Sequence, residues 1–157
     1  MKVLILGSGG REHALCWAIS KSPLCEKLFC IPGNAGIKSV AECINIKINN
    51  FNSIKKFIKK KKINFVIVGP EEPIVNGIVD KLNKLKIKIF GPNKKASILE
   101  SSKSFAKDFC KRNNILTANY KKFKNYKDAV NYIQNINYPI VIKASGLAGG
   151  KGVFIIK

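Results

Sequence analysis

The fold is decided by one stretch near the N-terminus, KVLILGSGGREH at residues 2–13. Its apolar run from Lys2 to Leu6 predicts a buried strand, and the glycines that follow predict a tight turn. A helix is then expected from Arg11 to Ser20. Because the first turn of a helix has backbone N–H groups without helical partners, this turn places donors and the Arg11 guanidinium where an anion could bind.

The same order of strand, turn and helix continues to residue 90. We predict further strands and helices, in chain order, at Lys27–Ile31 (strand), Phe51–Lys62 (helix), Phe65–Val68 (strand), Ile74–Leu85 (helix) and Ile87–Phe90 (strand). Alternation of this kind is typical of the α/β class, and it predicts a doubly wound, Rossmann-like parallel sheet.

Three turns that contain glycine follow predicted strands, at Gly7–His13, Pro32–Gly36 and Gly69–Pro73. Ligands of parallel sheets bind at the carboxyl ends of the strands, so we expect these turns to share a polar site. Each could also be an ordinary connection. A nicotinamide dinucleotide is disfavoured, because Glu12 and Pro32 stand where that fingerprint has a glycine and an acidic residue.

The second half of the chain contains another glycine-rich turn, KASGLAGGKG at residues 143–152. Apolar strand candidates precede and follow it, at Pro139–Ile142 and Val153–Ile156, so a β-hairpin is expected. A lysine near each end and several glycines suit a mobile lid over the phosphates of a nucleotide. The turn is not a strand–loop–helix phosphate motif, because Lys151 is followed by glycine and a strand. An ordinary glycine-rich hairpin is the alternative.

A boundary is indicated between the two halves. Pro92 and the polar run at residues 93–95 end the first half, and helices are expected afterwards at Ser104–Arg112 and Asn125–Asn135.

Lysine dominates the charge of the chain. The net charge is +20, yet only Arg11 and Arg112 are arginines among 29 basic residues. Because no aromatic-interleaved nucleic-acid motif is present, we interpret the lysines as a solvated surface that reflects composition, with no specific nucleic acid as partner. A basic nucleic-acid-binding module is the alternative, and it depends on net charge alone.

Cysteine usage and hydropathy indicate a cytoplasmic protein. The five cysteines contain no Cys-x-x-Cys pair and His13 is the only histidine, so the sequence predicts neither zinc nor disulfides, but reduced and mostly buried thiols. No apolar run approaches the roughly 20 residues that cross a bilayer, and the N-terminal apolar run is too short for a signal peptide. No membrane partner is expected.

Six ordered motifs resemble one family across the whole chain. They are GGREHAL at residues 9–15, PGNAG at 32–36, VGPE at 68–71, FGP at 90–92, SKSF at 102–105 and IKASGLAGGKGV at 142–153. Together they are similar to the phosphoribosylamine–glycine ligases, also called glycinamide ribonucleotide synthetases, which belong to the ATP-grasp superfamily.

The resemblance implies a domain organisation and a reaction. Residues 1–100 would form a substrate-binding α/β domain, and residues 101–157 an incomplete ATP-grasp domain that includes the lid. The implied reaction joins glycine to 5-phosphoribosylamine at the expense of ATP and gives glycinamide ribonucleotide, ADP and phosphate, an early step of de novo purine synthesis.

Roles follow from the resemblance residue by residue. ATP would contact Lys103, Lys143, Gly146, Gly149, Gly150, Lys151 and Gly152. Phosphoribosylamine would contact Gly9, Gly10, Arg11, Asn34, Gly69 and Glu71. No catalytic residue is assigned, and His13 is interpreted as structural.

The chain also departs from the family. Ser145 stands where the family usually has aspartate, and Gly149 where it usually has alanine. We expect the Ser145 hydroxyl to accept a backbone N–H at the start of its own turn and so keep part of the aspartate's role. The ligands for Mg²⁺ or Mn²⁺ would lie beyond residue 157. We therefore expect an incomplete form of the enzyme, a monomer when complete, with a non-catalytic binding remnant as the alternative.

Overall fold

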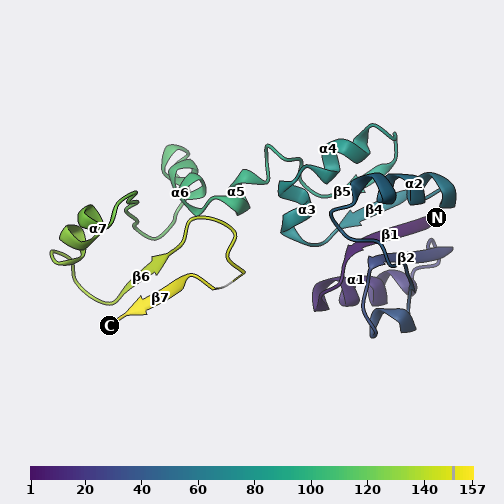
Figure 1. Cartoon of the computed structure of the whole chain (residues 1–157), viewed down its shortest axis with the longest axis horizontal. Helices are drawn as coiled ribbons and strands as arrows, with labels where there is room; N and C mark the ends of the chain where they lie inside the picture. The colour runs from purple at the N-terminus through teal and green to yellow at the C-terminus, as the bar shows by residue number, and fades with distance from the viewer. Residues whose placement is uncertain (150) are drawn as a thin grey trace. The chain divides into compact units, whose positions relative to one another are not determined.

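The computed structural model describes residues 1–149 and 151–157 (Figure 1). The prediction for Gly150 thus lies outside the described residues. Two compact units divide the chain, Met1–Ser97 and Ile98–Lys157. We call them unit 1 and unit 2 and describe each by itself.

Unit 1 is built on a parallel sheet of five strands in the order β3-β2-β1-β4-β5. Its elements, in chain order, are β1 (Lys2–Gly7), α1 (Gly10–Ser20), β2 (Lys27–Pro32), the 3-10 helix η1 (Ile37–Ser39), β3 (Glu42–Cys43), α2 (Phe51–Lys61), β4 (Phe65–Val68), α3 (Glu71–Val75), α4 (Ile78–Asn83) and β5 (Lys88–Phe90). The central strand β1 pairs with β2 and β4, so that Ile5 lies beside Cys30 and Ile67.

Both faces of this sheet are covered by helices. On one face Leu4 and Leu6 of β1 pack with α2 and α4, through residues such as Ile54, Ile58 and Leu82. On the other face Val3 and Ile5 pack with Cys16 of α1 and Ile37 of η1. Successive strand residues thus enter opposite cores, as the two-residue period of a strand requires. This arrangement confirms the doubly wound α/β sheet.

Two local predictions for unit 1 were wrong. The single helix expected at Ile74–Leu85 is two helices, α3 and α4, because Gly77 has a φ of +80° and lies in the left-handed region between them. Strand β3 was not predicted, since two residues are too short to show an alternating pattern. The 3-10 helix η1 was not predicted either. The other strands and helices of unit 1 lie within one residue of their expected bounds.

Unit 2 contains three helices and a β-hairpin among its described residues. They are α5 (Ile98–Ser101), α6 (Lys103–Arg112), α7 (Tyr126–Ile133), β6 (Ile140–Lys143) and β7 (Val153–Ile156). Strands β6 and β7 pair antiparallel, so the expected hairpin around the glycine-rich turn is confirmed. No described residue of unit 2 is buried. Among the described residues, no helix is long and apolar enough to cross a membrane.

Candidate functional site

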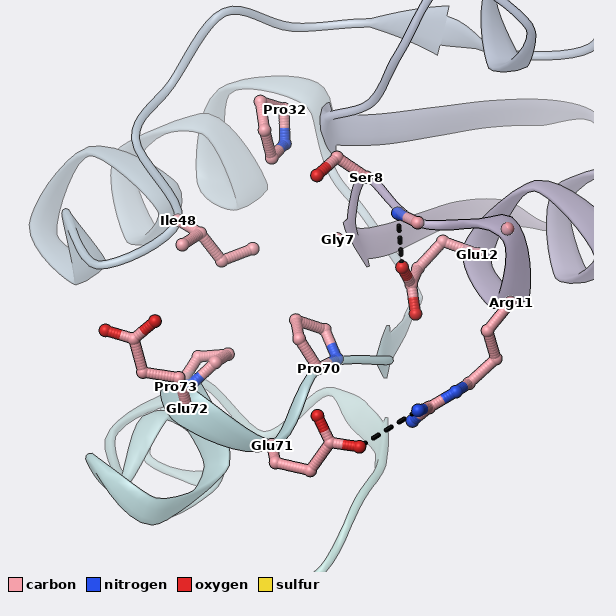
Figure 2. A pocket seen from close by; sticks show the side chains of 12 residues that line it. Gly7, Ser8, Arg11, Glu12, Pro32, Ile48, Pro70, Glu71, Glu72 and Pro73 are labelled. Carbon is pink, nitrogen blue, oxygen red and sulfur yellow. Dashed lines mark hydrogen bonds and ion pairs between the residues drawn. The ribbon is translucent and has the colours of Figure 1, made fainter. Parts of the chain in front are cut away.

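A pocket of about 460 Å³ lies at the carboxyl ends of the central strands of unit 1 (Figure 2). It is lined by residues 7–12, Pro32, Ile48 and residues 70–73. The turns after β1 and β4 and the end of β2 therefore meet at one edge of the sheet. Of the three glycine-bearing turns expected to share a site, those after β1 and β4 line this pocket, and the turn after β2 contributes only Pro32.

Arg11 links the turn after β1 to the turn after β4. Its Nη1 donates to the carbonyl oxygen of Gly69 at 2.9 Å, and its Nη2 forms an ion pair with Glu71 Oε1 at 2.9 Å. Figure 2 shows the two side chains pointing toward one another at the pocket wall. The pKa of Glu71 lies below its usual value, because its own backbone N–H and then the Arg11 guanidinium stabilise the carboxylate. The Arg11 side chain is 63% exposed, so a ligand in the pocket could contact it.

Glu12 is a buried carboxylate in the pocket wall that the sequence did not identify as functional. Only 4% of the residue is exposed, and Oε2 accepts a hydrogen bond from the Gly9 N–H at 2.7 Å. The spacing from Gly9 to a glutamate three residues later, as in a capping box, is the one sequence signal that could have found this contact. Because the Gly9 N–H is used internally, a ligand would meet the N–H groups of the following residues instead.

Asn34 and His13 are close to the turns of the pocket but do not line it. Asn34 Nδ2 donates to the Ser8 carbonyl oxygen at 2.8 Å, and its Oδ1 accepts from the Ile37 N–H at 2.9 Å. Asn34 therefore holds the turn after β2 to the turn after β1 without lining the pocket. His13 packs closely on Gly36, where an added Cβ would lie 2.9 Å from the imidazole Cε1.

The structure thus brings four of the six predicted substrate residues into the pocket lining: Gly9, Gly10, Arg11 and Glu71. Gly69 and Asn34 join them through hydrogen bonds to Arg11 and Ser8.

The opposite rim was not foreseen from the sequence. Ile48 and Glu72 line it (Figure 2), and Asn49 Nδ2 donates to Glu72 Oε1 at 2.8 Å. Asn49 belongs to an irregular segment before α2 with no motif of its own, so no sequence signal placed it beside α3. The lining contains Arg11 and three carboxylates, those of Glu12, Glu71 and Glu72. Such a lining suits hydroxyl and amine groups as well as an anion.

In unit 2 the start of α6 is bonded to the glycine-rich turn. The Lys103 backbone N–H donates to the Ser145 carbonyl oxygen at 2.9 Å, and Lys103 Nζ donates to the Gly146 carbonyl oxygen at 2.8 Å. Lys143 ends β6 opposite Val153. The two predicted phosphate lysines therefore flank Ser145 and Gly146, one held from α6 and one on the strand that enters the turn.

The Ser145 hydroxyl accepts a backbone N–H, as expected, but the donor belongs to α6 and not to the turn of Ser145. The expected partner was therefore wrong. Its Oγ accepts from the Ser104 N–H at 3.2 Å and lies 2.9 Å from Ser104 Oγ. The first turn of α6 has N–H groups without helical partners, and Ser145 satisfies two of them, that of Lys103 through its carbonyl oxygen and that of Ser104 through its hydroxyl.

Two further glycines of the turn have positive φ angles. Gly149 has a φ of +53°, and an added Cβ would meet nothing within 4 Å. Gly152 has a φ of +124°, where a side chain would be strained. The Lys151 N–H donates to the Ala148 carbonyl oxygen at 2.8 Å and closes the tip.

All five cysteines are free thiols. Cys16 and Cys30 are buried, whereas Cys25, Cys43 and Cys110 are half-buried, so the expectation that most are buried was wrong. Contact with the Cys16 thiol and burial raise the pKa of Cys30, whose Sγ donates to the Gly7 carbonyl oxygen at 3.3 Å. Among the described residues, no three His, Cys, Asp or Glu side chains gather as they would around a metal ion.

Comparison with known proteins gives concordant results for both units. Residues 1–100 match the family model "Phosphoribosylglycinamide synthetase, N domain", and residues 101–157 match "Phosphoribosylglycinamide synthetase, ATP-grasp (A) domain". The chain is 49% identical over 157 residues to a phosphoribosylamine–glycine ligase of Caldanaerobacter subterraneus subsp. tengcongensis, covering all of this chain and 38% of that protein. It is 51% identical over 155 residues to the ligase of Mesorhizobium japonicum, covering 99% of this chain and 36% of that protein.

A solved structure agrees. The crystal structure of phosphoribosylamine–glycine ligase from Thermotoga maritima aligns with a TM-score of 0.75 and 32% identity, over 99% of this chain and 36% of that one. The chain thus spans between a third and two fifths of the length of these relatives. On these matches, the chain belongs to the phosphoribosylglycinamide synthetase family.

Proposed function

We propose that this chain is the N-terminal part of a phosphoribosylamine–glycine ligase, which uses ATP to join glycine to 5-phosphoribosylamine in purine biosynthesis. One observation carries the proposal beyond the family match. The turns that bear the family motifs after β1 and β4 converge on one pocket and are joined there by Arg11 and Glu71. Free thiols at all five cysteines fit a reducing compartment such as the cytoplasm.

In this proposal residues 1–100 bind phosphoribosylamine. The pocket volume of about 460 Å³ lies in the usual range for small-molecule sites, roughly 300–1,000 Å³. Arg11 and the N–H groups that begin α1 would hold the phosphate, since both offer donors and positive charge. The carboxylate of Glu71 would accept hydrogen bonds from the ribose hydroxyls or the amine. Asn34 and Gly69 would support these groups by fixing the turns.

Residues 101–157 would begin the ATP-binding domain. Lys103, Lys143 and Lys151 supply positive charge around the turn, and Gly146 and Gly149 leave its backbone accessible, so these residues fit a phosphate chain. Gly152 would end the turn in a conformation that favours glycine. Gly150 is included from the sequence alone. ATP would supply the phosphoryl group that activates the glycine carboxylate, after which the amine of phosphoribosylamine attacks the carbonyl carbon and inorganic phosphate leaves.

The metal ion belongs to the longer protein in this proposal. Mg²⁺ or Mn²⁺ would neutralise the phosphates, with ligands outside this chain. We assign no step of the reaction to a metal held by the described residues.

Turnover tests this proposal directly. The 157-residue chain, supplied with ATP, glycine and phosphoribosylamine, should release no ADP above background. A polypeptide of the full length of the relatives, carrying this sequence as its N-terminal part, should release ADP only when both other substrates are present. Substrate-dependent ADP release by the 157-residue chain would contradict the proposal that turnover needs residues outside this chain.

A further inference from the structure

Three glycines make room for the side chain of Glu12. A Cβ added to Gly7 would lie 2.5 Å from Glu12 Cγ, and one added to Gly9 would lie 3.0 Å from Glu12 Oε2. A Cβ added to Gly69 would overlap Glu12 Oε1. These glycines stand at the end of β1, in the turn after it and in the turn after β4. The carboxylate therefore occupies a space that exists only because all three positions lack a side chain.

The position of this carboxylate has an energetic consequence. Burying a charged group is costly unless hydrogen bonds compensate, and the Gly9 N–H at 2.7 Å supplies one. That bond fixes the peptide that leads into Gly10 and the first turn of α1. Glu12 also packs on Gly69, whose carbonyl oxygen accepts from Arg11. Two consecutive residues of α1 thus hold the β4 turn, one by packing and one by a hydrogen bond.

We propose that Glu12 is a positioning residue for the ligand-binding turn, and that Gly69 is glycine in order to accept its carboxylate. The proposal rests on the function proposed for this pocket. In the absence of Glu12 the turn between β1 and α1 would lose the bond at Gly9, and Arg11 and the N–H groups of the first helical turn would no longer be held in one arrangement. A plain helix cap would stabilise α1 but would create no energetic dependence between residue 12 and residue 69.

The experiment is a double-mutant cycle on the 157-residue chain, read by calorimetric titration with ribose 5-phosphate. Glu12→Ala should weaken binding about tenfold or more, as for the loss of a hydrogen bond to a charged group. Glu12→Gln keeps an acceptor for the Gly9 N–H and should stay within about threefold of the parent. Glu26→Ala removes an exposed carboxylate between α1 and β2 and should change nothing.

Gly69→Ala is the second single variant of the double-mutant cycle. Alone it should weaken binding as Glu12→Ala does, because its methyl group displaces the carboxylate. Combined with Glu12→Ala it should cost little more than Glu12→Ala alone, because the space is then empty. Strict additivity of the two changes, or unchanged affinity in Glu12→Ala, would overturn the proposal. So would an equal loss in Glu12→Gln and Glu12→Ala.

Two further measurements separate this proposal from the function on which it rests. Hydrogen exchange of the Gly9 amide should be slow in the parent and faster in Glu12→Ala, and the same non-additivity with Gly69→Ala should be present in the free energy of unfolding. If the parent does not bind ribose 5-phosphate, the proposed function of the pocket fails, while these two readouts still decide the positioning role. If Glu12→Ala does not fold, Glu12→Gln and Gly69→Ala test the two contacts singly: Glu12→Gln should stay close to the parent in binding and in exchange of the Gly9 amide, and Gly69→Ala should weaken binding and speed that exchange. Unchanged binding and exchange in Gly69→Ala would then overturn the proposal.

Discussion

Units 1 and 2 are built from equally clear sequence patterns, yet they differ in what holds them together. Every buried apolar side chain of the described residues lies in unit 1, between Val3 and Leu82. In unit 2 the helices and the hairpin form, but Phe154 and Ile155 of β7 remain 63% and 66% exposed. Regular secondary structure therefore does not by itself produce a core.

In unit 2, hydrogen bonds and not apolar packing join the glycine-rich turn to α6. Ser145 and Lys103 join the glycine-rich turn to α6 through polar contacts, all of them exposed to solvent. Bonds of this kind contribute little net stability in water, because water competes for the same groups. We expect the further part of the longer ligase to cover the apolar hairpin and to strengthen these contacts.

The largest effect should appear when the two units are produced separately. Residues 1–97 should unfold cooperatively with temperature, since they keep both cores of the sheet. Residues 98–157 should show no cooperative transition, because none of their described residues is buried. Circular dichroism melts measure both. A cooperative transition in the second segment would remove the contrast between the units.

A matched pair of phenylalanine substitutions tests the same contrast within the intact chain. Phe29 of β2 is 1% exposed and meets Phe57 edge to face at 5.4 Å, whereas Phe154 is largely exposed. Phe29→Ala should lower the free energy of unfolding by about 3–5 kcal/mol, and Phe154→Ala by less than about 0.5 kcal/mol. Urea unfolding gives both values, and similar losses at the two sites would show that β7 is packed in solution.

Arg11 should matter for ligand affinity and little for stability. Arg11→Ala should weaken binding of ribose 5-phosphate by roughly 1.5–3 kcal/mol, as for a lost charged hydrogen bond. Its ion pair with Glu71 is partly exposed, so the stability should change by less than about 1 kcal/mol. Titration calorimetry and melting curves separate the two quantities. Collapse of the melting temperature with unchanged affinity would make Arg11 a structural residue.

Ser145 gives the smallest expected effect, measured in the full-length ligase. A carboxylate at this position can accept the same Ser104 N–H, so Ser145→Asp should change kcat/KM by less than about tenfold, or about 1.4 kcal/mol. Lys143→Ala should cost far more, because it removes a charge proposed to face the phosphates. A nearly inactive parent that aspartate rescues would indicate instead that this turn has lost its function.

The sequence predicted the backbone of the fold well for a local reason. Hydrophobic runs such as Lys2–Leu6 and Phe65–Val68 have the length and composition of buried strands, and α2 between them has the apolar period of a helix. The errors fall where the pattern is too short or is interrupted, at Glu42–Cys43 and at Gly77. The short strand and the break between the two helices both depend on the neighbouring parts of the fold and not on a local sequence pattern.

The candidate site divides in the same way. Motif residues such as Arg11 and Glu71 could be named from the sequence, because glycine turns after strands of a parallel sheet meet at one edge. The sequence by itself thus determined the sheet, the edge at which the candidate pocket lies, and the family.

Only the tertiary structure decided which groups touch. Arg11 reaches Gly69 and Glu71 across 58 and 60 residues, Glu72 finds Asn49, and Ser145 bonds to Ser104 across 41 residues. Glu12 became visible as a positioning residue only with Gly69 beside it. The physical reason is that residue spacing encodes local periodicity, whereas a contact between distant turns depends on strand order and on the room that a missing Cβ leaves.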